Sequence, residues 1–187
     1  MFNLLKIVKN TGDVTVKYPF APLELMPAFR GKPEYDPKQC IACAACTMAC
    51  PANALTMETD VKAGVRTWQL FVGRCIFCGR CEEVCPTHAL TLSQMFELAV
   101  TNKVDLYERA TFSLCNCRIC NRPFAPRKEV EYVMALMVQA GIDANVVNTR
   151  RSLLETCPEC RRRQNILDKN NIILNPQSIW RTDDDAE

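Results

Sequence analysis

The feature that most constrains this chain is an internal repeat, 35 residues long, that is marked by cysteines. In each copy the cysteines are separated by two, two and three residues, a proline follows the fourth, and Ala-Leu-Thr follows the proline after two intervening residues. The cysteines are Cys40, Cys43, Cys46 and Cys50 in the first copy, and Cys75, Cys78, Cys81 and Cys85 in the second. Such agreement between two copies excludes chance and places internal repetition at the centre of the fold.

The spacing C-x2-C-x2-C-x3-C-P is typical of bacterial two-cluster ferredoxins, in which each copy binds a [4Fe–4S] cube. Two-residue gaps let one loop present three thiolates, and small residues such as Ala42 and Gly79 leave backbone N–H groups free to point at sulfur. Proline suits the first position of a helix, so we expect a short helix to carry each fourth cysteine toward the other cube. The predicted ligand sets are crossed: Cys40, Cys43, Cys46 and Cys85 for cluster 1, and Cys75, Cys78, Cys81 and Cys50 for cluster 2. Zinc ligation or disulfides are the disfavoured alternatives.

The segments around the two runs predict an α+β, ferredoxin-like core. ALTMETD (54–60) and TWQLFVG (67–73) are β-rich and flank a hairpin connection, and ALTLSQMFELAV (89–100) is expected to be extended. So small a core depends on its clusters for stability. The single histidine, His88, is predicted to be a partly exposed helix residue, because thiolates fill all eight ligand positions.

A second metal site is predicted beyond residue 100, after a polar linking segment (101–114) that we expect to be partly helical. Two C-x2-C knuckles have the format of a tetrahedral site. Its predicted ligands are Cys117, Cys120, Cys157 and Cys160. Ligand type leaves zinc and a single rubredoxin-like iron both open. Cys115 fits a knuckle poorly and is interpreted as a buried thiol, with ligation as the alternative.

The 36 residues between the knuckles contain a predicted helix in KEVEYVMALMVQAG (128–141), with Gly141 at its C-terminal end. Its apolar residues recur at helical spacing and are expected to face a core. They are Val130, Val133, Met134, Met137 and Val138.

Composition favours a reducing, intracellular environment. Thirteen cysteines are an odd number, and MFNLLKIVKN is too briefly apolar for a signal peptide. The formal charge is only +2 and the basic residues are scattered, which argues against nucleic-acid binding. With no nucleotide-binding motif and one histidine, the sequence offers no catalytic constellation and no small-molecule substrate site.

Four parts are therefore expected along the chain. Residues 1–36 form an N-terminal docking arm whose first residues make a short amphipathic helix suited to a partner or a membrane surface. A neighbouring subunit is the preferred contact of this proline-rich arm, and folding back over the core is the alternative. Residues 37–100 form the two-cluster domain, 101–164 the four-cysteine domain with its inserted helix, and 165–187 a C-terminal segment with an acidic tail.

These features resemble known electron-transfer subunits. The pattern VTVKYP…FRGKP ahead of the two cysteine runs resembles the eight-iron, 23-kDa-type subunit of respiratory complex I over residues 5–95. The added region from LCNCRICNRPFAP to TCPECRRR is more similar to the iron–sulfur subunits of group 4 membrane-bound [NiFe] hydrogenases, the group of formate hydrogenlyase and hydrogenase 4. The second resemblance extends over nearly the whole chain.

The hydrogenase resemblance implies a non-catalytic subunit that relays single electrons through two [4Fe–4S] clusters. Its implied partners are the small and large [NiFe] hydrogenase subunits, a ferredoxin-type electron-donor subunit and the membrane-arm subunits. The implied location is peripheral, on the cytoplasmic side of the inner membrane. A complex I-type subunit that passes electrons toward quinone, and a free two-cluster ferredoxin, are the alternatives.

Overall fold

The computed structural model describes residues 2–12 and 15–169. Its largest element is an antiparallel sheet in the order β2-β3-β5-β6. The strands β2 (Leu55–Asp60) and β3 (Val65–Phe71) form the predicted hairpin. The Asp60 carboxylate accepts the N–H groups of Lys62 and Ala63 in the turn, and Gly64 adopts the left-handed conformation that closes it. The hairpin prediction is confirmed.

The predicted linking segment is instead the longest strand of the sheet. A single 3-10 turn, η2 (Lys103–Leu106), is followed by β5 (Tyr107–Asn116), which pairs with β3 from Val65↔Ser113 to Phe71↔Tyr107. Ala110, Phe112 and Leu114 alternate with exposed residues and turn toward the interior. This alternation at a period of two residues determines the strand, so the expectation of partial helix was wrong for most of the segment. The last residues of β5 pair with β6 (Pro123–Pro126).

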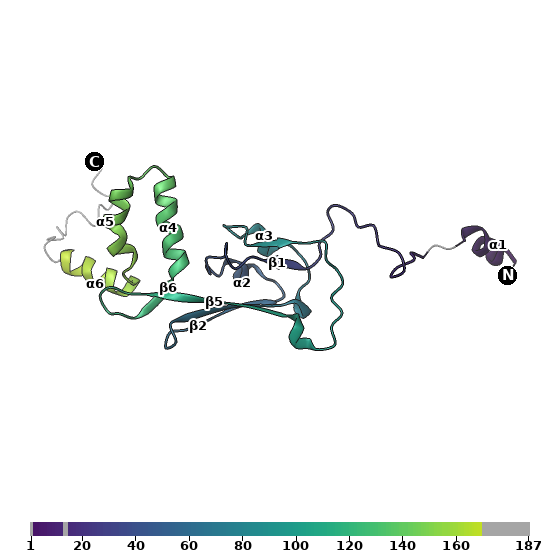
Figure 1. Ribbon diagram of the computed structural model, residues 1–187, viewed down its shortest axis with the longest axis horizontal. Coiled ribbons are helices and arrows are strands. Elements are labelled where there is room, and N and C mark those ends of the chain that lie inside the picture. The colour runs from purple at the N-terminus through teal and green to yellow at the C-terminus, as the bar shows by residue number, and fades with distance from the viewer. Residues whose placement is uncertain (1, 13–14, 170–187) are drawn as a thin grey trace, which may run out of the picture.

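The cluster loops lie above this sheet, together with a two-stranded antiparallel pair of β1 (Pro33–Tyr35) and β4 (Leu90–Leu92) (Figure 1). Each loop contains one short helix, α2 (Ala45–Ala49) or α3 (Arg80–Glu83), and a 3-10 turn, η1 (Val72–Arg74), leads into the second loop. The core between loops and sheet includes Trp68 and Leu70, which are almost fully buried.

The short helices do not follow the fourth cysteines, as the sequence predicted; they precede them. After each proline the chain makes one turn, closed by Asn53 N–H on Cys50 O and by His88 N–H on Cys85 O. Asn53 and His88 then take a left-handed backbone conformation, which ends the turn before a helix can propagate. His88 is exposed, but it belongs to this turn and not to a helix.

Three helices form the far end of the molecule: α4 (Arg127–Gln139), α5 (Ala144–Leu154) and α6 (Pro158–Lys169). Gly141 has a positive φ just beyond α4, as expected for the residue that ends a helix. The expectation that the apolar stripe of α4 is core holds only in part, because Met134 and Met137 are half-buried. Val130 is buried, whereas Val133 and Val138 are exposed; the main neighbours of α4 are α5, β5 and β6.

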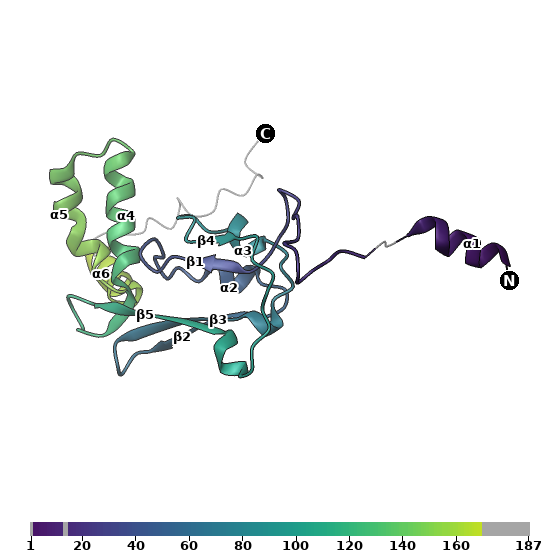
Figure 2. The same cartoon turned by 45° about the vertical axis from the view of Figure 1, so that its right-hand side comes forward.

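The N-terminal arm begins with α1 (Phe2–Thr11), which stands apart from the rest in both views (Figures 1 and 2). The end of the arm folds back: Gly31 N–H donates to Ser93 O and Lys32 N–H to Met95 O, while Phe29 packs edge-on against Phe96. Of the described helices, none combines the length and apolar character needed to cross a membrane. The predicted acidic tail lies outside the described residues, and the division into four parts stays a prediction.

Candidate metal centres

The eight repeat cysteines line two cavities, four in each. Cys40, Cys43 and Cys46 share the first cavity with Cys85, and Cys75, Cys78 and Cys81 share the second with Cys50. The fourth cysteine of each run therefore lies with the loop of the other copy. This is the pairing that the crossed ligand sets require.

The backbone repeats with the sequence. Ala42 and Phe77, the second residues after the first cysteine of each run, have positive φ angles of 59° and 54°. Their N–H groups donate to Cys40 Sγ and Cys75 Sγ, each at 3.4 Å. Behind the fourth cysteines, the N–H groups of Ala54 and Ala89 donate to Cys50 Sγ at 3.3 Å and Cys85 Sγ at 3.2 Å. Two equivalent cradles of backbone N–H groups thus face the sulfur atoms.

Burial alone opposes ionisation of these cysteines. It raises the pKa of the Cys46 and Cys81 thiols to about 11, since a thiolate loses hydration in the interior. A metal cluster reverses this balance, because a coordinating thiol is deprotonated by the cations that it binds. Four convergent cysteines and N–H donors aimed at sulfur fit a cubane cluster in both cavities.

The first cavity also contains two aromatic side chains, which the sequence reasoning missed. Tyr35 and Trp68 stack with their ring centroids 3.7 Å apart. Burial raises the pKa of Tyr35 above its ordinary range, and the nearby Cys40 thiol raises it further. The alternation in TWQLFVG, which places Trp68 on the same face as Leu70, was the signal that could have identified one of them.

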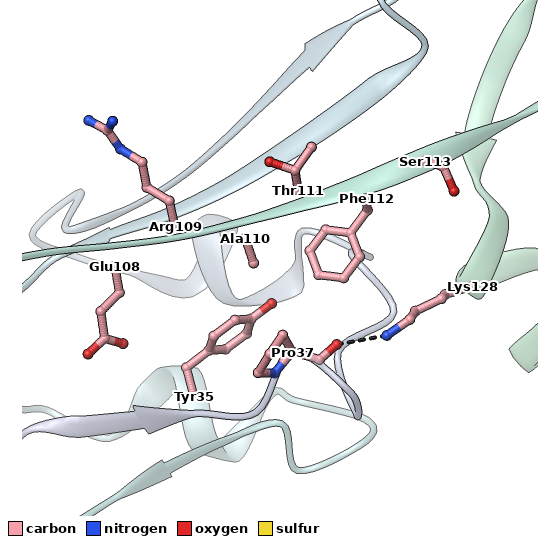
Figure 3. Close-up of a pocket in the computed structure, with 9 residues that line it drawn as sticks. All are labelled: Tyr35, Pro37, Glu108, Arg109, Ala110, Thr111, Phe112, Ser113 and Lys128. Carbon is pink, nitrogen blue, oxygen red and sulfur yellow. Dashed lines mark hydrogen bonds between the residues drawn. The ribbon is translucent and has the colours of Figure 1, made fainter.

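An open pocket of about 560 Å³ lies on the other side of Tyr35, between β5 and the first cluster loop (Figure 3). Phe112 and Lys128 line it, and the Lys128 ammonium donates to Pro37 O at 2.7 Å. Tyr35 is thus the side chain common to the first cavity and this pocket.

The predicted four-cysteine site is assembled at the far end of β5. The sulfur atoms of Cys117, Cys120, Cys157 and Cys160 all lie within 4.8 Å of one another. Cys117 Sγ accepts the N–H groups of Ile119 at 3.4 Å and Cys157 at 3.3 Å. Although burial raises the pKa of the Cys117 thiol, backbone N–H groups of Cys120, Cys157 and Ile119 lower it overall. Four sulfurs at this spacing fit one tetrahedral ion and leave no position for a substrate.

Two neighbours define the edge of this site. Cys115 is buried on β5 and lies outside the four-sulfur group, in agreement with its interpretation as a buried thiol. Glu155, two residues before Cys157 of the second knuckle, accepts from Arg118 at 2.5 Å and from Arg151 at 2.6 Å. These ion pairs join the first knuckle to α5 and keep the two knuckles together.

Comparison with known proteins supports an iron–sulfur domain in the region of the cysteine repeat. The family model of the 4Fe-4S dicluster domain matches residues 39–89. Formate hydrogenlyase subunit 6 of Escherichia coli (strain K12) is 53% identical over 174 residues, which are 93% of this chain and 96% of that protein. The chloroplastic NAD(P)H-quinone oxidoreductase subunit I of Angiopteris evecta is 35% identical over 61 residues, 33% of this chain and 34% of that protein.

A solved structure of the membrane-bound sulfane sulfur reductase, an archaeal respiratory membrane complex, contains a similar chain. The two are 36% identical, and the alignment covers 54% of this chain and 53% of the other, with a TM-score of 0.42.

Proposed function

The chain belongs to the family of formate hydrogenlyase subunit 6, and on this premise we propose that it relays single electrons between subunits of a membrane-associated [NiFe] hydrogenase complex. The observation that carries the proposal is the pair of cavities, each lined by four cysteines that are shared between the two repeats. A [4Fe–4S] cluster bound in each would supply a one-electron redox site. The proposed ligands are Cys40, Cys43, Cys46 and Cys85 for cluster 1, and Cys75, Cys78, Cys81 and Cys50 for cluster 2.

The chain itself positions the cysteines that would bind the clusters. Backbone N–H groups hold the sulfur atoms, and two arginines brace the loops: Arg66 donates to Ala42 O and Arg30 to Cys78 O, both at 3.0 Å. One electron enters from a reduced iron–sulfur donor subunit and one leaves to an oxidised acceptor subunit, while no bond forms or breaks in this chain. The role is therefore non-catalytic, and catalysis belongs to the partners.

The four-cysteine group is proposed to hold a structural ion, zinc or a single iron. Its sulfurs come from the two ends of a segment that contains α4 and α5. An ion there ties this segment to the end of β5 and thereby fixes a surface beside the cluster-binding part.

Partner subunits are proposed to cover the apolar surfaces that this chain leaves open. Leu4 and Leu5 of α1 and Phe20 of the arm are all largely exposed. Exposed apolar patches of this kind mark protein or membrane contacts. We propose that α1 and the first part of the arm contact a neighbouring subunit at the cytoplasmic face of the inner membrane, with the hydrogenase small and large subunits and a ferredoxin-type donor in the same complex.

A second candidate function is transfer toward quinone, as in complex I-type assemblies. The observation that favours it is the similarity to NAD(P)H-quinone oxidoreductase subunit I, but this extends over only 33% of the chain. Similarity to formate hydrogenlyase subunit 6 includes the four-cysteine region as well, so the hydrogenase function is preferred.

The test is affinity purification of the full-length chain from anaerobically grown cells under mild detergent. The proposal expects a nickel-containing complex, with about eight irons in this chain. Recovery of the chain with a quinone-reducing assembly and no nickel would favour the second candidate, and recovery as a free protein would contradict both.

A further inference from the structure

The two cluster cavities share a backbone but differ in their side chains. Superimposing the repeats by their offset of 35 residues pairs Met57 with Leu92 and Thr87 with Ala52. Of the described residues that line the second cavity, none other than the cysteines carries a side-chain hydrogen-bond donor. The first cavity has three such residues, Tyr35, Trp68 and Thr87.

Two of these donors are buried without a partner. Among the side chains of the described residues, Tyr35 Oη and Trp68 Nε1 are the buried polar atoms that make no hydrogen bond. Trp68 is completely buried, and the stacked pair lines the cavity with Cys40 and Cys46. An unsatisfied buried donor is costly, so a native protein normally provides an acceptor for it. The acceptors that a filled cavity would provide are sulfur atoms.

The third donor, Thr87, already lies beside a cysteine sulfur. Thr87 Oγ1 lies 3.7 Å from Cys85 Sγ, and against a thiolate the hydroxyl must be the donor. The equivalent residue beside Cys50 is Ala52, which has no hydroxyl.

Three other determinants of the potential can be compared between the two sites: the burial of the cysteines, the backbone N–H contacts to sulfur and the nearby arginines. Each ligand set contains one buried and three partly buried cysteines. Each cavity has the same two backbone N–H contacts to sulfur, at 3.2 to 3.4 Å. Each loop has one arginine on a backbone carbonyl, and the one at the first loop, Arg66, is the more buried. The three side-chain donors, together with the more buried Arg66, therefore remain as the differences.

We propose that Tyr35, Trp68 and Thr87 donate hydrogen bonds to the sulfur atoms of cluster 1, which gives cluster 1 the more positive midpoint potential of the two. This inference rests on the proposed function, since it requires both clusters. Reduction adds one negative charge to a cluster, and donors to its sulfurs stabilise that charge; hydrogen bonds to sulfur are among the factors that set such potentials. Within the chain, an electron is thus favoured on cluster 1.

The test is a redox titration of the anaerobically purified, cluster-loaded full-length chain, followed by electron paramagnetic resonance. Trp68→Phe and Tyr35→Phe retain an aromatic ring and remove the donor, and Thr87→Ala copies the residue at position 52. Each is expected to shift the higher of the two potentials to a more negative value and to leave the lower one in place. The matched control is Tyr107→Phe, because Tyr107 stacks on Phe71 and lines neither cavity.

A reciprocal variant tests the same inference by adding a hydrogen-bond donor to the second cavity. Ala52→Thr places a hydroxyl beside Cys50 and is expected to raise the lower potential, so that the two values approach each other. If Trp68→Phe loses iron, Thr87→Ala and Ala52→Thr still test whether side-chain donors raise the potential. Unchanged potentials in iron-replete variants, or a shift confined to the lower potential, would overturn the inference and leave the relay intact. Wild-type protein that binds fewer than about six irons would instead overturn the proposed function.

Discussion

In the cluster-binding part, the cysteines surround a core built on Trp68 and Leu70, whereas in the four-cysteine part the cysteines are themselves the core. The first core also includes Leu55, Leu90 and Phe112. The second consists of Cys117, Cys157 and Cys160, with Phe124 packed against them. The difference indicates two kinds of dependence on metal. Apolar burial supports the first part in addition to its clusters, but the second part has little besides its ion.

The largest effect is expected from Cys157→Ser, which removes one ligand of the four-cysteine site. For structural sites of this kind, metal binding supplies roughly 10–16 kcal/mol of apparent folding free energy. The variant should lose its ion and the fold of the region around α5, while β2, β3 and the clusters persist. Hydrogen exchange measured by mass spectrometry checks this, with Cys115→Ser as the control that retains protection. Continued protection of α5 in the variant would contradict the claim that the four-cysteine part depends on its ion for stability.

A smaller effect is expected when the apolar cores are tested directly. Leu70 is 1% exposed, so Leu70→Ala should lower the free energy of unfolding by about 2–5 kcal/mol. Leu136 on α4 is 43% exposed, so Leu136→Ala should change it by about 0.5 kcal/mol or less. Anaerobic denaturant titrations, followed by cluster absorbance, provide the measurement. Similar losses for the two variants would show that the α4 face is as well packed as the core.

The smallest effect concerns the ion pairs beside the second site. Hydrogen bonding to Arg151, together with the charges of Arg151 and Arg118, lowers the pKa of Glu155. A depressed pKa stabilises the fold above the unfolded value of about 4.3, and this stabilisation is lost as pH falls through the folded value. Glu155→Gln should therefore be less stable than wild type near neutral pH, and the two proteins should converge as pH falls through the lowered pKa of Glu155. A stability difference that persists at pH values below that pKa would exclude the ion pairs as its source.

The sequence predicted correctly those features that a local residue pattern determines by itself. The repeat placed eight cysteines in register, and the hairpin followed from β-rich segments around Gly64. Two C-x2-C knuckles were enough to group four sulfurs, although α4 and α5 separate them along the chain.

The failures share a cause, which is that long-range packing overrides a local signal. Charged residues in YERATFSL hid the inward alternation of Ala110, Phe112 and Leu114, which only pairing with β3 makes visible. Proline after each fourth cysteine suggested a helix, but left-handed residues three positions after the cysteine, Asn53 and His88, end the turn. The aromatic pair of the first cavity joins β1 to β3, and spacing along the chain contains no information about that contact.

The exchange of Cys50 and Cys85 between the loops is the central claim, and Cys85→Ser tests it most directly. After anaerobic purification, exposed thiols are alkylated and the modified peptides are identified by mass spectrometry. Loss of cluster 1 should expose Cys40, Cys43 and Cys46 to alkylation and reduce iron from about eight to about four, while Cys75, Cys78 and Cys81 stay protected. Cys50→Ser should give the opposite pattern. Alkylation of Cys75, Cys78 and Cys81 in Cys85→Ser would contradict the crossed arrangement.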